Sequence, residues 1–509
     1  MLLIRAKHPH TAQSRSRRAC LTRRALACLL AAVLAGGIFA PAPALAEVRG
    51  TDQLLGTTVA ERGLPAVACP NVTAKYALVV GADGTVYFAR DADTQTHIAS
   101  ITKVMTAIVA LDSGMPLDTT VTVSEAAGTV GESSAELAVG DKLSLQAALT
   151  GLMVPSGNDA AIAIAETVGA TLAAEGQDPN EAFVAAMNAK AAELGMTSTL
   201  FSNPHGLDVG EFDNEMYSTA RDVAVMCAYA MKNETFRAIV AMPTAQLTVT
   251  KPDGATDIID LTSSDLLLGN YEGACGIKTG FTDTAGYAFA GACNRGEGDL
   301  YAIVLGTPSE SARFEDTKAL LNWVYNNRMT YALAHSPQTV PMDADGTVTE
   351  VPLIAEVPLI AEVPQSAWPD KRVKATLADP SATVEVFAPE GNVSQELITH
   401  DLPGAVSVGD VVGTLNFYQG NELIASQELV ATEDSPAPDL FQSIGFWWDR
   451  LWAGFGGTEL VAEPVLVNET PLIYSKAATD QNIDDIRAVA AGEAPLSEGD
   501  SSSDDSKEE

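Results

Sequence analysis

Strand patterns lie at both ends of residues 72–330 and helical patterns lie between them, an order that narrows the possible folds. Residues 76–80 and 85–89 are rich in β-forming side chains and flank Ala82-Asp83-Gly84, a turn sequence. Apolar spacing predicts helices at residues 102–112, 143–153, 159–168, 181–194 and 219–231. Strand patterns return at residues 276–280, 287–292 and 301–306, before a closing helix at 310–326. We therefore expect an α+β sandwich whose first and last strands share one sheet.

The chain has 509 residues, which is too long for one ordinary hydrophobic core. Residues 337–432 consist of short Val, Ile and Leu runs punctuated by Gly, Pro and Asp, which predicts a small all-β domain. A six-residue repeat, Glu-Val-Pro-Leu-Ile-Ala, begins at Glu350 and again at Glu356. Its prolines favour an edge strand or a linker.

Residues 1–46 have the composition of a secretory signal peptide. Seven Lys and Arg side chains are followed by an apolar run at 25–40 and by Ala44-Leu45-Ala46, which suits cleavage. An uncleaved anchor is the alternative, but the run is shorter than the roughly 20 residues that span a bilayer. We expect an exported protein that works outside the cytoplasm, in the cell wall or periplasmic space, with residues 47–71 leading into the α+β domain.

The net charge limits the possible partners. Removal of the signal would change the formal net charge from −36 to −43, because the segment contains seven bases and no acid. Nucleic acids are bound through clustered Lys and Arg side chains. A nucleic-acid partner is therefore not expected.

Residues 439–457 carry apolar side chains, many of them aromatic, at three- and four-residue spacing. These are Leu440, Phe441, Ile444, Trp447, Trp448, Leu451, Trp452 and Phe455. Such a helix has one apolar face, and we expect residues 440–457 to lie on the outer face of the cytoplasmic membrane. Packing against the β domain is the alternative. Residues 458–509 become polar and finally acidic, which favours disorder.

Four cysteines remain after the signal: Cys69, Cys227, Cys275 and Cys293. If a hairpin turns near Thr284, Cys275 lies opposite Cys293, and a disulfide between them is conceivable. Free buried thiols are an equal alternative, since unpaired cysteine packs as a small apolar residue.

The histidines argue against two common hydrolytic mechanisms. The mature chain has His97, His205, His335 and His400, with no metal-binding pair on a helix and no Gly-x-Ser-x-Gly sequence. A zinc enzyme or a Ser-His-Asp hydrolase is therefore not expected, and neither a metal nor another cofactor is predicted. His205 lies in a loop with Pro and Gly, which favours a structural role.

A serine and a lysine in Ala99-Ser100-Ile101-Thr102-Lys103 are spaced to lie about one helical turn apart on the same face. A lysine that is desolvated near another cation can be neutral and accept the serine proton. Because this spacing also arises by chance, the pair alone is weak evidence.

Two further short sequences add to the pair. In Pro155-Ser156-Gly157-Asn158, which lies between two predicted helices, Ser156 could relay protons and Asn158 could orient a substrate amide. Helix capping is the ordinary role of such residues and is the alternative. In Lys278-Thr279-Gly280, at the end of a strand pattern, the lysine would face a substrate carboxylate and Gly280 would let the substrate backbone approach.

Together these three motifs resemble those of the serine D-alanyl-D-alanine carboxypeptidases, low-molecular-mass penicillin-binding proteins that share the triplet with serine β-lactamases. Flanking segments extend the resemblance over residues 72–330. They are Ala99-Ser-Ile-Thr-Lys-Val-Met-Thr-Ala107, Val139-Gly-Asp-Lys-Leu143, Val154-Pro-Ser-Gly-Asn-Asp-Ala160, Phe201-Ser-Asn-Pro-His-Gly-Leu207, Ser218-Thr-Ala-Arg-Asp222 and Gly276-Ile-Lys-Thr-Gly-Phe-Thr282. The resemblance implies a β-lactamase/penicillin-binding-protein-like transpeptidase fold, which is an antiparallel sheet with a helical cluster, and the β-rich segment looks like the family's second domain.

The resemblance also implies a chemistry. Ser100 would attack the bond between the two terminal D-alanines of a peptidoglycan stem peptide, or a β-lactam, and form an acyl-enzyme. Lys103 would be the base, and Ser156 and Lys278 would complete the proton network.

Further roles follow for the matching positions. The backbone N–H groups of Ser100 and Phe281 would form the oxyanion hole. Thr279 and Arg313 would hold the terminal carboxylate, although Arg313 can also be read as a surface charge on a helix.

Three other functions remain open at this stage. A DD-endopeptidase would use the same catalytic residues. A β-lactamase usually has Asp where Gly157 stands, and it needs a deacylating Glu that we cannot place. A wall-binding pseudoenzyme would leave the three intact motifs without a purpose.

Overall fold

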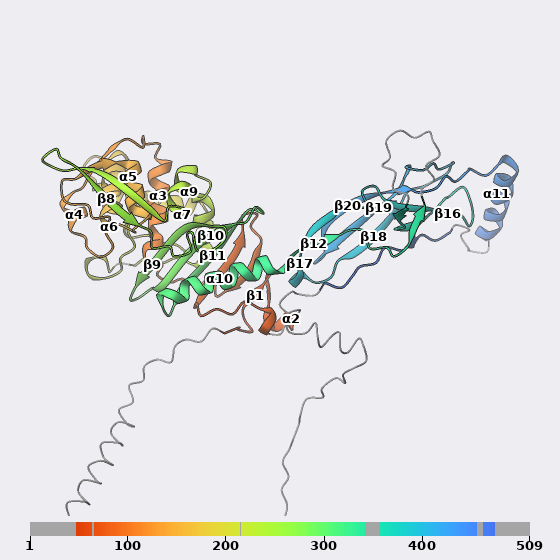
Figure 1. Ribbon diagram of the computed structural model, residues 1–509, viewed down its shortest axis with the longest axis horizontal. Coiled ribbons are helices and arrows are strands. Elements are labelled where there is room, and N and C mark those ends of the chain that lie inside the picture. The colour runs from red at the N-terminus through yellow and green to blue at the C-terminus, as the bar shows by residue number, and fades with distance from the viewer. Residues whose placement is uncertain (1–46, 64–65, 214, 342–355, 456–461, 474–509) are drawn as a thin grey trace, which may run out of the picture. The chain divides into compact units, whose positions relative to one another are not determined.

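The computed structural model describes residues 47–63, 66–213, 215–341, 356–455 and 462–473 (Figure 1). Three segments with sequence predictions lie outside the described residues. They are the proposed signal peptide at 1–46, the first copy of the six-residue repeat at 350–355, and the acidic end at 474–509.

A seven-stranded antiparallel sheet lies at the centre of the α+β part, in the order β2-β1-β4-β3-β11-β10-β9. Its strands are β1 (Gln53–Leu54), β2 (Thr57–Thr58), β3 (Tyr76–Gly81), β4 (Val86–Arg90), β9 (Ala274–Thr282), β10 (Gly286–Asn294) and β11 (Asp299–Thr307). The pairing of β3 with β11 confirms that early and late strands share one sheet. Residues 47–71 contribute two strands, β1 and β2, rather than only leading into the domain. The last strand, β9, has an open edge.

The sheet is covered on both faces (Figure 1). Along β11, Leu300, Ala302 and Val304 pack in the same core as α10 (Glu310–Asn327), whereas Tyr301 and Ile303 join the core of the helical cluster. This alternation follows from the two-residue period of a strand. The clustered helices are α3 (Lys103–Asp112), α4 (Glu125–Thr129), α5 (Leu145–Met153), α6 (Asn158–Leu172), α7 (Pro179–Glu193), α8 (Ala220–Ala230) and α9 (Glu234–Val240).

A second, four-stranded sheet was not anticipated from the sequence. It consists of β5 (Thr120–Thr122), β6 (Lys142–Ser144), β7 (Thr244–Thr250) and β8 (Thr256–Thr262). On β7 and β8 only two residues per strand are buried, and threonines and acids face outwards. So polar a hairpin gives a weak apolar signal in the sequence.

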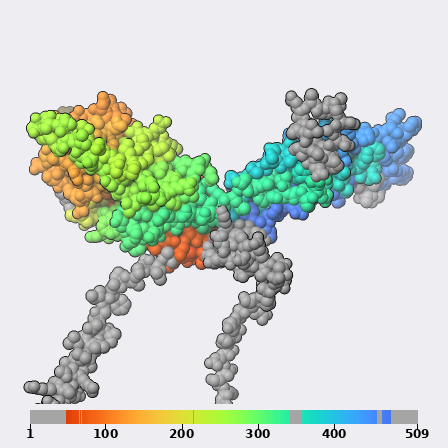
Figure 2. All heavy atoms as spheres, in the orientation of Figure 1, coloured from red at the N-terminus to blue at the C-terminus, as the bar shows by residue number. Residues whose placement is uncertain are grey.

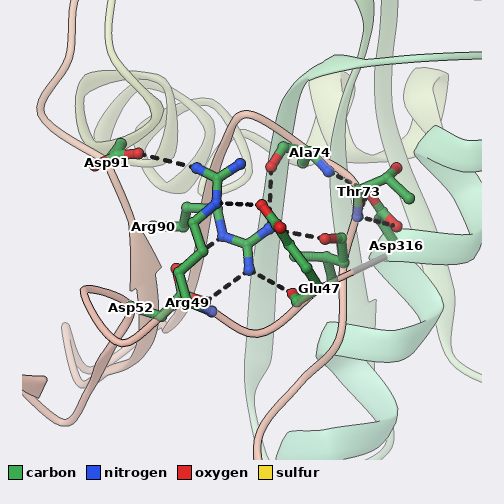
Figure 3. A network of polar contacts seen from close by, with 9 residues as sticks. Glu47, Arg49, Asp52, Thr73, Ala74, Arg90, Asp91 and Asp316 are labelled. Carbon is green, nitrogen blue, oxygen red and sulfur yellow. Dashed lines mark hydrogen bonds and ion pairs between the residues drawn. The ribbon is translucent and has the colours of Figure 1, made fainter. Parts of the chain in front are cut away.

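A buried arginine attaches the N-terminal segment to the sheet (Figure 3). Arg90 is 1% exposed and makes two hydrogen bonds to the carboxylate of Asp52, at 2.8 and 2.6 Å. Its remaining donors bind the backbone carbonyls of Val72, Ala74 and Glu47. Nearby, Asp316 of α10 accepts hydrogen bonds from the backbone N–H groups of Thr73 and Ala74. These bonds fasten residues 47–52 and 72–74 to β4 of the main sheet and to α10.

The described residues after α10 are mainly β, with a six-stranded sheet in the order β18-β19-β20-β16-β15-β21 and two separate strand pairs. The strands are β12 (Arg328–Ala332), β13 (Thr339–Pro341), β14 (Glu356–Pro358), β15 (Ala361–Pro364), β16 (Arg372–Leu377), β17 (Thr383–Phe387), β18 (Ser394–Thr399), β19 (Val411–Gln419), β20 (Glu422–Ala431) and β21 (Val465–Leu466). The second repeat copy begins in β14, which pairs only with β13 among the described strands, as its proline suggests.

Helix α11 (Leu440–Phe455) follows the β strands, and the chain then returns to the sheet through β21. The sequence favoured disorder from residue 458, but residues 462–473 form specific contacts. Asn468 is buried, donates to the carbonyl of Leu333 and accepts from the backbone N–H of His335. Side-chain to backbone bonds of this kind give no periodic pattern that a sequence can reveal.

No disulfide joins Cys275 and Cys293. The predicted hairpin register holds from Gly276, opposite Ala292, to Thr282, opposite Gly286, but a bulge then places Cys293 opposite Ala274. Cys293 packs in the core beneath α10, whereas Cys275 packs against the helical cluster on the other face. Thiols on opposite faces of a sheet cannot be bridged without moving the backbone.

Candidate active site

Ser100 lies in a short 3-10 helix, η2 (Ala99–Thr102). Lys103 is the first residue of α3, which follows directly. Lys103 is fully buried. Its Nζ lies 2.8 Å from Ser100 Oγ and 2.9 Å from the carbonyl oxygen of His205. The sequence predicted an ordinary helical turn, and the tighter 3-10 turn superposes residues three apart even more closely.

The turn that bears Ser100 depends on a close backbone approach. Ala99 has a positive φ of 48°, and its carbonyl oxygen would lie 2.0 Å from a Cβ placed on Gly206. Asn203 Oδ1 accepts hydrogen bonds from the N–H groups of His205 and Gly206 and holds this loop in position. The loop at 203–206 therefore supports both the serine turn and the lysine amine.

Ser156 lies between α5 and α6, Asn158 is the first residue of α6, and neither side chain acts as a helix cap. The N-cap of α6 is Gly157, without a side-chain bond. Asp159 binds the backbone N–H of Ala160 in the first turn and those of Ala135 and Leu137 in a distant loop. Ser156 has a positive φ of 72° and is nearly buried. Asn158 donates to the carbonyl of Gly131, while its Oδ1 is buried without a partner. The unused oxygen can accept a hydrogen bond from a ligand.

Lys278 and Thr279 come from β9, the edge strand of the main sheet. Lys278 is 1% exposed and donates to the carbonyl of Thr279 at 3.1 Å. A Cβ at Gly280 would lie 2.8 Å from the carbonyl oxygen of Ile98. The space at Gly280 thus admits the segment leading to Ser100.

Phe281 and Arg313 border the same strand. Phe281 belongs to β9 and is 48% exposed, with its ring against Tyr287. Arg313 is 4% exposed, donates to the carbonyl of Gly280 at 3.3 Å, and pairs with Glu310 at 2.9 Å. The alternative reading of Arg313 as a solvent-facing helix charge is therefore wrong, because α10 directs its side chain under β9.

The chain matches known proteins over most of its described length. Residues 64–309 match the profile of a family described as D-alanyl-D-alanine carboxypeptidase. A D-alanyl-D-alanine carboxypeptidase of a Streptomyces species is 36% identical over 290 residues, which make up 55% of this chain and 97% of that protein. The chain belongs to the D-alanyl-D-alanine carboxypeptidase family.

Two further comparisons describe the reach of the similarity. The D-alanyl-D-alanine carboxypeptidase DacC of Escherichia coli is 28% identical over 406 residues, which make up 76% of this chain and 90% of that protein. The crystal structure of a Streptomyces DD-transpeptidase is 32% identical and matches 50% of this chain and 97% of its own, with a TM-score of 0.47.

Family membership establishes what the protein does at a general level. It is a serine-type D-alanyl-D-alanine carboxypeptidase, a hydrolase of a family that acts on cell-wall peptidoglycan and binds β-lactams. Because peptidoglycan is outside the cytoplasm, the carboxypeptidase acts there.

Electrostatics within the carboxypeptidase site favour an uncharged Lys103. Burial lowers the pKa of Lys103 well below its ordinary value, and the positive charge of Lys278 lowers it further, while Asp159 opposes the shift. Burial, followed by repulsion from Arg313, lowers the pKa of Lys278 to about 7. A cluster of buried cations thus makes an unprotonated amine beside Ser100 accessible near neutral pH.

His205 is buried, and its side chain contacts its own loop. Burial, together with the charge of Lys103, lowers the pKa of its imidazole to about 3, so the ring is neutral. Its Nδ1 accepts a hydrogen bond from the N–H of Leu207, and its ring packs edge-on against Phe212. The expected structural role fits these contacts, although the sequence did not show that its carbonyl would bind Lys103.

Sequence reasoning missed two groups of residues near the carboxypeptidase site. Ser264 Oγ lies 2.6 Å from Thr279 Oγ1, and Asp265 is buried beside it. Asp208, also buried, accepts a hydrogen bond from Thr282 and lies 3.0 Å from His97 Nδ1. The dipeptide Ser264-Asp265 resembles any polar turn, so only its position against β9 reveals its relevance.

Proposed function

We propose that Ser100 is the nucleophile of this carboxypeptidase and that Lys103 is its base. The observation that carries the proposal is the 2.8 Å contact between Lys103 Nζ and Ser100 Oγ, at a lysine whose pKa is lowered by burial and by Lys278. A neutral amine at this distance can accept the hydroxyl proton as Oγ attacks the carbonyl between the two terminal D-alanines of a wall pentapeptide.

The reaction then proceeds through two covalent steps. Attack forms the ester C–O bond through a tetrahedral intermediate, whose oxyanion the backbone N–H groups of Ser100 and Phe281 would stabilise. Collapse breaks the C–N bond, and the proton held by Lys103 passes to the leaving amine with Ser156 as relay. Water next adds to the ester and gives a proton to Lys103. That proton returns to Ser100 when the ester C–O bond breaks.

The remaining site residues would bind the peptide. Lys278, Thr279 and Arg313 supply positive charge and a hydroxyl group for the terminal carboxylate. The unpartnered Oδ1 of Asn158 is available to accept a substrate amide N–H. Gly280 contributes by letting β9 approach Ile98, which keeps the serine turn beside the strand.

Incubation with a pentapeptide that ends in D-Ala-D-Ala tests the assignment. Wild-type protein should release free D-alanine, and Ser100→Ala should not. Labelled penicillin should add one adduct, located at Ser100 by mass spectrometry. Release that is undiminished in Ser100→Ala, or an adduct at another residue, would overturn the proposal.

The choice of substrate distinguishes the alternative functions. A DD-endopeptidase would cut a crosslinked dimer faster than the monomeric pentapeptide, and a pseudoenzyme would release no D-alanine. A β-lactamase would turn penicillin over rapidly. The structure disfavours Asp at position 157, the residue usual in that class, because a Cβ there would lie 2.5 Å from Asp159 Oδ1 and 2.8 Å from the carbonyl of Gly151.

We also propose that α11 rests on the outer face of the cytoplasmic membrane after export and removal of residues 1–46. Phe441 is 84% exposed and Trp447 is 60% exposed, and α11 (blue) lies at the surface on the face that Figure 2 shows. The other face of the helix is fastened to the β region, since Phe446 contacts Trp368 and Arg450 donates to the carbonyl of Ser366. No helix within the described residues is long and apolar enough to cross a bilayer.

Flotation with vesicles of phosphatidylethanolamine and phosphatidylglycerol tests the membrane proposal. The mature protein should float, and the double variant Phe441→Ser with Trp447→Ser should remain at the bottom. Gln442→Ala, also on an exposed part of the helix, is the matched control and should float as the wild type does. Equal flotation of all three proteins would reject the proposal.

A further inference from the structure

A short turn before β9 touches the segments that carry two of the motifs. The backbone N–H of Ser264 donates to the carbonyl of Val154, just ahead of Ser156, at 3.3 Å. Its side-chain oxygen lies 2.6 Å from Thr279 Oγ1. The next residue, Asp265, is therefore held between the loop of Ser156 and the strand of Lys278.

The carboxylate of Asp265 is buried and only partly satisfied. The side chain is 6% exposed, and Oδ1 accepts the N–H of Leu267 at 2.9 Å. Oδ2 is buried without a hydrogen-bond partner. Its charge interacts with those of Lys278 on β9, Arg313 on α10 and the thiol of Cys275 on β9. A buried carboxylate with an unused oxygen is costly unless opposite charges nearby stabilise it.

Lys278 is likewise buried with few polar contacts for its charge. It is 1% exposed, and the only hydrogen bond of its Nζ within the described residues is to the carbonyl of Thr279. The charges that act on it are Arg313, which repels it, and Asp265, which attracts it. Beyond Lys278, Lys103 is repelled by Lys278 and attracted by Asp159.

The carboxylate of Asp159 binds more hydrogen-bond donors than that of Asp265. Its carboxylate already accepts the backbone N–H groups of Ala135, Leu137 and Ala160 and the hydroxyl group of Ser134. The carboxylate of Asp265 accepts fewer hydrogen bonds, from the backbone N–H groups of Leu267 and Leu268, and its charge also attracts Lys278 and Arg313.

We propose that Asp265 is a positioning residue that acts through Lys278: its carboxylate keeps Lys278 protonated, and protonated Lys278 keeps Lys103 unprotonated beside Ser100. The inference rests on the proposed role of Lys103 as the base. It assigns to Asp265 control over the pH range in which the carboxypeptidase can acylate.

The pH dependence follows from the signs of the charges. Burial raises the pKa of Asp265 to about 6, and the pKa of Lys278 is lowered to about 7, so between these values both groups are charged. Removal of the negative charge lowers the pKa of Lys278 further, because less attraction remains to offset burial and Arg313. Lys278 then loses its positive charge at a lower pH than in the wild type.

The decisive measurement is kcat/KM for the pentapeptide against pH, in wild type and in Asp265→Asn. The asparagine keeps an oxygen for the N–H of Leu267 but has no charge. The alkaline limb of the profile should move to lower pH by about one unit, the size of shift that a nearby opposite charge produces. Asp265→Glu should return the limb towards its wild-type position.

Ser264→Ala is the matched control, because it removes the contact with Thr279 and leaves the charge in place. It should lower kcat/KM similarly at every pH without moving the limb. Should Asp265→Asn fail to fold, Asp265→Ser removes the same charge with a smaller side chain. An alkaline limb that stays in place in the folded uncharged variant, or a loss that is uniform across pH, would overturn the inference.

Penicillin labelling keeps this outcome separate from the proposed function. If wild-type protein is acylated at Ser100 while the uncharged variant keeps the wild-type profile, only the role of Asp265 is wrong. If Ser100 is not acylated in the wild type, the nucleophile assignment fails first.

Discussion

The carbonyl oxygen of His205 accepts a hydrogen bond from Lys103 Nζ at 2.9 Å, so a loop 102 residues further along the chain holds the buried amine beside Ser100. The same loop contains Gly206, against which the carbonyl of Ala99 is packed. The geometry of the proposed nucleophile and base therefore depends on a backbone segment that carries none of the three motifs.

Gly206→Ala should disturb this geometry. Its Cβ would lie 2.0 Å from the carbonyl oxygen of Ala99, so the serine turn must move. Displacement of reacting groups by about 1 Å costs on the order of 100-fold in rate, and we expect a loss of that size in kcat/KM for D-alanine release. Gly210→Ala is the control, because Gly210 also has a positive φ but no atom within 4 Å of the added Cβ. Equal losses in the two variants would contradict this explanation.

Lys278→Met should lower the activity and raise the free energy of unfolding. The pKa of Lys278 is about 7 in the folded protein, against about 10.4 in unfolded chains. Between these values the unfolded chain binds more protons, so this lysine makes the free energy of unfolding rise with pH. Methionine removes the cost of burying this amine, so it should raise that free energy at pH 6, and by less at pH 9.

Urea unfolding of Lys278→Met and wild type at both pH values measures the difference. D-alanine release by the variant should fall sharply, because a positive charge near the substrate carboxylate is lost. A variant that is less stable than wild type at pH 6 would show that Lys278 is well compensated in the folded state.

Arg90→Met should destabilise the fold through the bonds shown in Figure 3. The substitution leaves the fully buried carboxylate of Asp52 without its cation, and breaking a buried pair in this way costs about 3–5 kcal/mol. Arg49→Met removes a neighbouring arginine whose side chain is 33% exposed, and it should cost less than about 1 kcal/mol. Urea unfolding of both variants tests the contrast, which would be refuted by similar losses.

Cys275 and Cys293 should remain thiols in the exported carboxypeptidase. They pack against opposite faces of the main sheet, and burial raises the pKa of both, which keeps them protonated and unreactive. After denaturation without a reductant, both should be alkylated in full, as peptide mass spectrometry can measure. An intact peptide pair linked by a disulfide would contradict the structure.

The proposed site illustrates which relationships the sequence makes visible. Ser100 and Lys103 are three residues apart, so their proximity follows from local geometry alone. The contacts of Lys103 with His205 and of Thr279 with Ser264 join distant segments, and neither His205 nor Ser264 differs in type from an ordinary loop residue. The buried position of Arg313 depends on the direction of α10 relative to β9, which no local sequence pattern reveals.

The sequence was sufficient for the α+β class, for the main hairpin register from Gly276 to Thr282, and for the family, because periodic apolar spacing and short motifs are local properties of a chain. The tertiary structure decided the second sheet, the bulge that separates Cys275 from Cys293, and the buried charges around Lys278. Burial and electrostatic interaction depend on which atoms surround a group in space, and those atoms come from segments far apart in the chain.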